Sequence, residues 1–282
     1  MRLGINLLCV AGHIDEGHLP LIERIAAIGY DHVEVPVMHG TPDHYAWLGG
    51  RLAEMGLGRA QTSIVPDAGA DPLSEDASIR GRGLDHLSWI QDCAEALGSE
   101  TVGGPFHAPI GHFTGAGPTE AEIARGVEAH RAMAERAARG GYLLALEPLN
   151  RFETYFLNTT EQSRAYAGKV GHPAFGVMYD TFHANIEERD QPAAIAHLGE
   201  AMHVLHVSEN DRGVPGRGQI DFGAAFGAAK AAGFDGHVVI EAFGAGVPEL
   251  AAATRVWRPL FPDLETLFAE AHDFVRRTWE AA

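Results

Sequence analysis

The sequence predicts a (β/α)₈ barrel, and three observations lead to this fold class. Eight short apolar segments alternate with segments of helical periodicity, and no shift in composition marks a linker between two domains. Dividing 282 residues among eight such units gives about 35 residues each, close to the size of one βα unit in a barrel. The glycine-rich phosphate-binding loop of a doubly wound sheet, the competing fold class, is also missing from the sequence. We therefore expect a single barrel domain over residues 1–282.

The competing fold class is a doubly wound sheet, which usually carries a glycine-rich phosphate loop after an early strand. Gly81-Arg82-Gly83 and Gly244-Ala245-Gly246 lack a third glycine and the change from strand to helix that such a loop requires. Lys169 has neither a Walker spacing nor a following Ser or Thr. These comparisons favour the barrel.

Apolar runs and helix-ending glycines define the elements in the first half of the chain. Residues 3–10 are a short apolar run and form the first strand candidate. Residues 18–28 then carry apolar side chains at helical spacing, and Gly29 follows where a helix C-cap favours glycine. The next elements follow the same logic, with strands at 32–37, 58–65 and 101–104 and helices at 45–55 and 79–97.

The second half repeats the pattern with a clearer helix signal. Thr119 and Glu122 form a capping-box pattern that begins a helix running to Arg139, just before two glycines. The remaining strand candidates are short apolar runs at 143–146, 175–178, 202–206 and 237–240. The remaining helical segments are 160–170, 191–198, 222–232 and a stretch from 250 that prolines at 259 and 262 interrupt.

The charge balance excludes several classes of protein. Lys and Arg total 21 against 38 Asp and Glu, so the formal net charge is −17. Phosphate backbones and anionic lipid surfaces repel so acidic a chain, which argues against a nucleic-acid or membrane partner. No apolar run reaches the length of a membrane span, and the N-terminal segment lacks a signal-peptide cleavage pattern. We expect a soluble, cytoplasmic protein.

The chain contains two cysteines, Cys9 and Cys93, and each lies in an apolar stretch. Two cysteines cannot build a disulfide framework or a cysteine-rich zinc site. We therefore expect both to be small buried core residues.

Four residues of metal-ligand type stand at the ends of the last four predicted strands. They are Glu147, Asp180, His206 and Glu241. In a barrel the carboxyl ends of the strands meet at one mouth, which would bring these side chains together. Three carboxylates and one imidazole suit Mn²⁺, Mg²⁺ or Co²⁺, whereas zinc sites more often contain further His or Cys. Polar residues commonly follow strands, so any one of these four residues alone is weak evidence. A residue of ligand type at the end of each of four successive strands favours a metal site. The sequence does not assign a role to His107 and His112, which follow the fourth strand and can also face the mouth.

The motifs around these residues resemble those of the ketose 3-epimerases. This group contains the D-tagatose and D-psicose 3-epimerases of the xylose-isomerase-like sugar isomerase/epimerase superfamily. The similar motifs are EPLNRFE at 147–153 with LNT at 157–159, DTFHANIEE at 180–188, HVSENDR at 206–212 with PGRG at 215–218, EAF at 241–243 and VWR at 256–258. The likeness extends from Gly4 through the final helix and is densest over 147–258.

The resemblance implies a reaction as well as a metal site. It implies Mn²⁺ or a similar ion on Glu147, Asp180, His206 and Glu241. A ketose bound through its C2 carbonyl and C3 hydroxyl would have an acidified C3–H. Glu147 and Glu241 would then act as base and acid on the two faces of C3, through a cis-enediolate.

The resemblance also assigns residues that hold the sugar. Glu153, His183 and Arg212 would bind the C1–C3 end, and Arg212 would help to stabilise the developing oxyanion. Arg151, in the same motif, is better interpreted as a loop residue that pairs with an acid. The resemblance also implies a homo-oligomer, either a dimer or a tetramer.

Departures from the family pattern leave the substrate open. The first strand carries Asn6-Leu7-Leu8-Cys9 where family members often have aromatic residues, and Ser208 stands where they have glycine. These changes alter the wall around C4–C6, so neither the ketose nor its phosphorylation is fixed.

An aldose–ketose isomerase or a keto-sugar lyase on the same metal site remains an alternative. A non-catalytic sugar-binding barrel is a third, against which the intact Glu147 and Glu241 count. A nuclease function conflicts with the charge.

Overall fold

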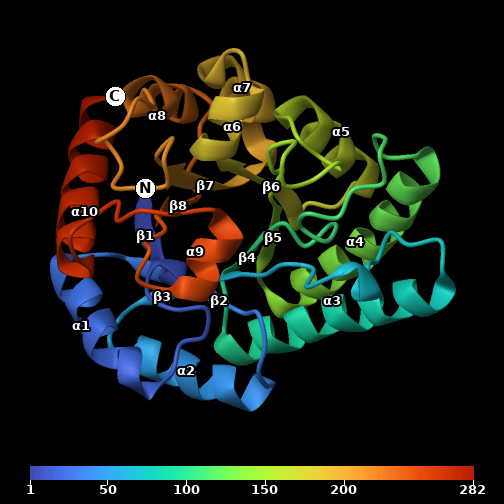
Figure 1. Ribbon diagram of the computed structural model, residues 1–282, viewed down its shortest axis with the longest axis horizontal. Coiled ribbons are helices and arrows are strands. Elements are labelled where there is room, and N and C mark those ends of the chain that lie inside the picture. The colour runs from blue at the N-terminus through green and yellow to red at the C-terminus, as the bar shows by residue number, and fades with distance from the viewer.

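The computed structural model describes the backbone of residues 1–282 and every side chain except that of residue 249. Within this described part, eight parallel strands close into a barrel in chain order, with the first strand paired to the eighth. Figure 1 shows the strands at the centre and the helices around them. The predicted fold class is confirmed. The strands are β1 (Arg2–Asn6), β2 (His32–Pro36), β3 (Gly58–Thr62), β4 (Thr101–Gly104), β5 (Leu143–Leu146), β6 (Phe175–Asp180), β7 (Met202–Ser208) and β8 (His237–Glu241).

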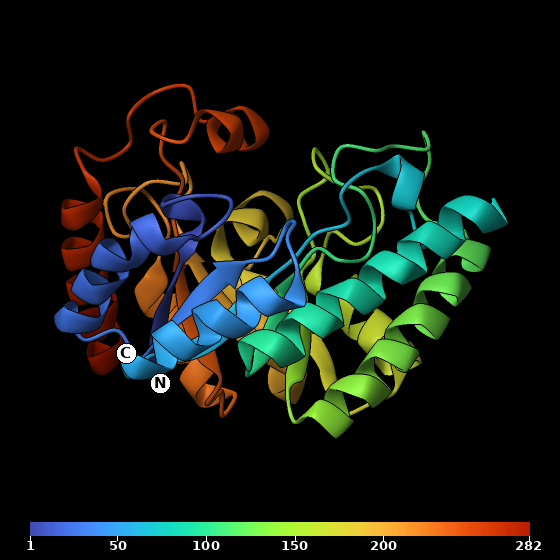
Figure 2. The same ribbon diagram turned by 90° about the horizontal axis from the view of Figure 1, so that it is seen from below.

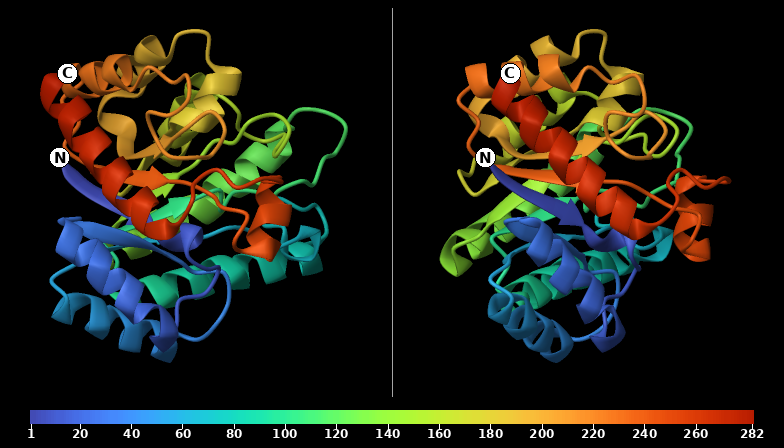
Figure 3. Two further views of the ribbon diagram at one scale, coloured as in Figure 1. Left: turned by 60° about the vertical axis from the view of Figure 1, so that its left-hand side comes forward. Right: turned by 90° about the vertical axis from the view of Figure 1, so that its left-hand side faces the viewer.

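Helices connect the strands and cover the outside of the barrel. The two longest, α3 (Ala77–Leu97) and α4 (Glu120–Gly140), lie side by side on one flank (Figure 2). Thr119 begins α4 with the predicted capping box, in which the Glu122 carboxylate accepts from the Thr119 backbone N–H at 2.7 Å. The other helices are α1 (Leu19–Ile28), α2 (Pro42–Glu54), α5 (Thr160–Val170), α6 (Thr181–Glu187), α7 (Gln191–Leu198), α8 (Phe222–Ala231), α9 (Pro248–Thr254) and α10 (Leu264–Ala281). The last helix packs beside α1, and the two chain ends lie on the same side of the barrel (Figure 3).

The structure corrects two sequence-based predictions. The first strand ends at Asn6, not at residue 10, because the Asn6 side chain accepts a hydrogen bond from the Leu8 backbone N–H and starts a 3₁₀ turn. The short helix α6 was not predicted. Asp180 caps it, since its Oδ1 accepts from the backbone N–H groups of Phe182 and His183 at 2.6 and 3.0 Å.

The alternation of side chains along the strands positions the functional residues. A small buried cluster, separate from the main core between strands and helices, contains one residue from each of the last four strands. Its members are Ala145, Met178, Val204 and Val239. Side chains two positions apart on a strand point to the same face. Two positions after these four residues stand Glu147, Asp180, His206 and Glu241, which therefore point into the mouth of the barrel.

The two cysteines are buried with free thiols, as the sequence predicted. Among the described residues, none of the helices combines the length with the apolar character that crossing a bilayer requires.

Candidate active site

The four predicted metal ligands converge at the carboxyl end of the barrel, and all four are at most 6% exposed. The imidazole of His206 is the central contact. Its Nδ1 lies 3.6 Å from Asp180 Oδ2 and 3.5 Å from Glu241 Oε1. Glu147 joins the group through Asp180 and His183, with which it forms a second trio of potential ligands. The structure therefore brings together the side chains that the sequence placed at the ends of four strands.

Two buried atoms in this cluster fit a cation. Asp180 Oδ2 and His206 Nδ1 have no hydrogen-bond partner among the described residues, although both are shielded from water. The other oxygen of Asp180 is already used in capping α6. Because unpaired buried polar atoms are costly, a carboxylate oxygen and an imidazole nitrogen left facing each other are an arrangement that a divalent ion would satisfy.

Arg212 and His183 border the cluster on one side. The guanidinium of Arg212 donates to the Glu241 carboxylate and to Ser208 Oγ, and lies between the rings of Phe182 and Phe243. Its Nη2 is 3.2 Å from His183 Nε2. These contacts keep a permanent positive charge beside the carboxylates.

His183 is oriented by the loop that follows β5. Its Nδ1 accepts a hydrogen bond from the Asn150 backbone N–H at 3.1 Å, so a neutral imidazole carries its proton on Nε2, and the neighbouring Arg212 Nη2 is a second donor and not the acceptor of that proton. That Nε2 lies 3.5 Å from Glu147 Oε1. Burial, reinforced by the Arg212 charge, lowers the pKa of His183 to about 3, and the ring therefore stays neutral.

Two further charged residues of the EPLNRFE motif, Glu153 and Arg151, have different partners. Asn150 Nδ2 donates to Glu153 Oε1 at 2.8 Å, which ties Glu153 to the residue that orients His183. Arg151 instead donates three hydrogen bonds to Glu187, two from its guanidinium and one from its backbone N–H, and so pairs with an acid as the sequence predicts.

The carboxylates of Glu147 and Glu241 differ in acidity although both are buried. Burial and the charge of Glu241 raise the pKa of Glu147 well above its usual range. Burial also acts to raise the pKa of Glu241, but Arg212 and His206 outweigh this effect and lower it. Without a bound ion, the pKa values of the two groups therefore lie on opposite sides of the usual value.

One buried residue that contacts the cluster is not identified by the sequence motifs. Glu34 in β2 is fully buried and its Oε2 lies 3.0 Å from His206 Nε2. The signal that could have revealed it is a charged residue in the middle of the apolar run 32–37. His107, left ambiguous, is buried and donates through Nε2 to the Glu147 carbonyl at 3.1 Å, whereas His112 is exposed.

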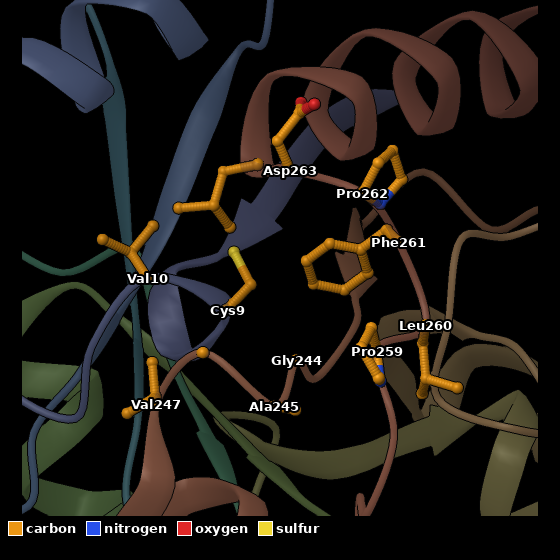
Figure 4. A pocket seen from close by; sticks show the side chains of 12 residues that line it. Cys9, Val10, Gly244, Ala245, Val247, Pro259, Leu260, Phe261, Pro262 and Asp263 are labelled. Atoms are coloured by element: carbon orange, nitrogen blue, oxygen red, sulfur yellow. The ribbon is translucent and has the colours of Figure 1, made fainter.

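A cavity of about 410 Å³ lies beyond the ends of β1 and β8. Figure 4 shows Cys9 and Phe261 entering it from opposite walls. The rest of its lining is Val10, residues 244–247 and residues 259, 260 and 262–264. Burial raises the pKa of the Cys9 thiol to about 12, so the thiol stays protonated at neutral pH.

A closed parallel barrel with a carboxylate- and histidine-lined mouth defines the class of barrel enzymes that act on small molecules at the strand ends. Within this class, the chain belongs to the xylose isomerase-like TIM barrel family, whose model matches residues 22–278. It is 34% identical over 279 residues to a ketose 3-epimerase of Arthrobacter globiformis, covering 98% of this chain and 96% of that protein. It is 32% identical over 251 residues to a D-psicose 3-epimerase of Agrobacterium fabrum, covering 86% and 84%.

Solved structures agree with these sequence relationships. The chain superposes on a structure of an L-ribulose 3-epimerase with a TM-score of 0.91 at 31% identity, covering 99% of this chain and 95% of that one. These relatives are epimerases, and the chain is an enzyme of the isomerase class.

Proposed function

We propose that the protein is a metal-dependent epimerase that inverts C3 of a ketose through a cis-enediolate. The observation that carries this proposal is the arrangement of Glu147 and Glu241, two buried carboxyl groups that point into the mouth of the barrel beside Asp180 and His206. Two carboxyl groups at a single site can remove a proton from one face of a carbon and supply a proton to the other face, which is what inversion of that carbon requires. The epimerase names of the relatives support the same reaction.

Four residues would hold the metal ion: Glu147, Asp180, His206 and Glu241. Their three carboxylates and one imidazole favour Mn²⁺, with Mg²⁺ or Co²⁺ as alternatives. The unpaired Asp180 Oδ2 and His206 Nδ1 support this assignment. When bound, the ion supplies polarisation of the C2 carbonyl and stabilises negative charge on its oxygen.

The proton transfers belong to the two glutamates. Ionised Glu241 removes the proton from C3, and the electron pair of that C–H bond forms the C2–C3 double bond of the enediolate. The carboxylic acid of Glu147 then gives a proton to the opposite face of C3, and the C2 carbonyl re-forms. The two groups exchange roles in the reverse direction, as reversibility requires.

The C1–C3 end of the sugar would lie against Glu153, His183 and Arg212. The proton on His183 Nε2 can donate to a sugar oxygen because Nδ1 is already held by the Asn150 backbone. Arg212, permanently charged, faces the carboxylates and stabilises the oxyanion that develops on the substrate.

We also propose that residues 1–282 form one domain, since β1 pairs with β8 and the barrel cannot close without both ends of the chain. A dimer or tetramer, testable by analytical ultracentrifugation, and a cytoplasmic location stay predictions.

Solvent deuterium tests the reaction. Free and phosphorylated ketoses are incubated with enzyme and Mn²⁺ in heavy water, and product identity and label position are followed by NMR. Deuterium confined to C3 of an epimerised ketose is expected. Label at C1 or C2 would instead indicate an aldose–ketose isomerase, and carbon–carbon cleavage would indicate a lyase. Full activity of Glu147→Gln and Glu241→Gln would contradict the assigned acid and base.

A further inference from the structure

A buried carboxylate on β2 contacts the ring nitrogen of His206 that faces away from the other proposed ligands. The side chains of Glu34 and His206 are both 0% exposed, and Glu34 Oε2 lies 3.0 Å from His206 Nε2. None of the sequence motifs includes Glu34. Its partner His206 is at the centre of the proposed metal site. The contact therefore links β2 to a site whose proposed ligands all come from the ends of β5 to β8.

The direction of this hydrogen bond determines whether the other ring nitrogen, Nδ1, carries a proton or a lone pair. A carboxylate can only accept, so Nε2 carries the proton and donates it to Glu34. A ring that binds a metal ion is neutral and has one ring proton, so Nδ1 would then present a lone pair to the ion. That lone pair faces Asp180 Oδ2 and Glu241 Oε1. The contact thus fixes both the tautomer and the ring orientation needed for a ligand nitrogen.

Glu34 is itself held in place by Asn6 on the neighbouring strand. Asn6 pairs in register with Glu34, and its Nδ2 donates to Glu34 Oε2 at 2.7 Å and lies 3.5 Å from Glu241 Oε1. The Asn6 amide cannot turn over without loss, because its Oδ1 accepts from the Leu8 backbone N–H at 2.8 Å. Asn6, Glu34 and His206 therefore form a chain of fixed donors and acceptors that ends at the cluster.

We propose that Glu34 is a positioning residue that presents His206 Nδ1 to a divalent ion, with Asn6 as its support. The inference rests on the proposed metal site and adds to it a residue outside the proposed ligand set. Metal-binding histidines commonly donate their second ring N–H to a carboxylate, and loss of that partner weakens metal affinity about 10- to 100-fold.

The test measures Mn²⁺ affinity of metal-free protein from the electron paramagnetic resonance signal of unbound Mn²⁺. Glu34→Leu removes the acceptor and is expected to bind Mn²⁺ about 10- to 100-fold more weakly. Glu34→Gln keeps an oxygen at the Oε2 position, which can accept from both His206 and Asn6, and is expected to recover part of that loss. Glu187→Gln, which removes a buried carboxylate paired with Arg151, is the control and is expected to bind like wild type.

Two results would overturn the inference while leaving the metal site intact. One is a Glu34→Leu protein that binds Mn²⁺ within about twofold of wild type. The other is a Glu34→Gln protein as weak as Glu34→Leu, which would mean that charge alone acts and orientation does not. Thermal unfolding of the metal-free variants checks that they fold. Should Glu34→Leu not fold, Glu34→Ala replaces it in the comparison with Glu34→Gln, and wild-type affinity of Glu34→Ala counts against the inference. A wild-type protein that binds no Mn²⁺ would instead refute the proposed function itself.

Discussion

Arg212 donates a hydrogen bond from its guanidinium to the carboxylate of Glu241, and the two side chains are both buried. This pairing keeps Glu241 ionised despite its burial. The backbone of Arg212 has a positive φ of 67°, an uncommon conformation for a residue other than glycine, and its carbonyl accepts from the Phe243 N–H at 2.8 Å. The loop that carries Arg212 is thus tied to the end of β8, beside its partner.

Replacement of Arg212 by Met is expected to lower kcat about 10²- to 10³-fold, because it removes a charge that stabilises the developing oxyanion. Steady-state kinetics on the ketose identified by the substrate screen measure the effect. Arg151→Met is a matched control, since Arg151 is mostly exposed and pairs with Glu187 outside the cluster. Comparable losses in the two variants would contradict the role given to Arg212.

The loop around Arg212 depends on a second buried glutamate. The Glu209 carboxylate accepts hydrogen bonds from the backbone N–H groups of Gly216, Gln219 and Ile220 at 2.9, 3.1 and 3.2 Å. A Cβ at Gly218 would overlap this carboxylate. Gly218→Ala is therefore expected to displace Glu209 and to destabilise the protein by about 1–3 kcal/mol, the usual cost of leaving buried polar groups unpaired.

Urea-induced unfolding measures this change. Gly227→Ala serves as the control, because Gly227 lies inside α8 with open space at its Cβ position, and alanine there is expected to stabilise by about 0.5–1 kcal/mol. A Gly218→Ala protein as stable as wild type would show that Glu209 does not organise the loop.

The sequence predicted the barrel and the proposed ligands because both rest on local patterns. An apolar run that ends in Glu147 or Asp180 can be seen without knowing what lies across the barrel. Glu34 could not be assigned in this way, since its role arises from contact with His206, which is distant in sequence and joined only when the barrel closes. The helix α6 is hidden in the sequence for another reason: Asp180 is both the last residue of β6 and the cap of α6, so no turn separates the two elements.

The two thiols are expected to resist alkylation in the folded protein. Burial raises the pKa of Cys9 and of Cys93 to about 12, so almost no thiolate is present at pH 8. Iodoacetamide at pH 8 should modify both cysteines in urea and neither in the native protein, as followed by mass spectrometry. Cys9 is the more informative of the two because it lines the cavity beyond β1 and β8. Rapid native labelling at Cys9 alone would mean that the cavity opens to solvent and activates the thiol.

Acid is expected to destabilise the protein through buried neutral histidines, and His130 allows this to be measured. Its Nε2 donates to the Phe106 carbonyl at 3.3 Å and its Nδ1 accepts from the Tyr166 hydroxyl at 2.6 Å. Burial lowers the pKa of His130 from 6.5 to about 4. Between these two values the unfolded chain binds a proton that the folded protein does not, so stability falls as pH falls from 6.5 toward 4 and is unaffected by this group above 6.5.

The full contribution of His130 is about 3 kcal/mol, from the linkage between pKa and the free energy of unfolding. His130→Gln keeps a donor and an acceptor but does not titrate. Urea unfolding at pH 7 and pH 4.5 should therefore show a smaller loss of stability in the variant than in wild type, even if the variant starts less stable. Acid-sensitive groups that do not interact with His130 cancel in this comparison because both proteins contain them, whereas the titration of His107 changes with His130 because the His130 charge helps to lower the His107 pKa. An identical pH dependence in the two proteins would mean that His130 is not the buried neutral group that its contacts indicate.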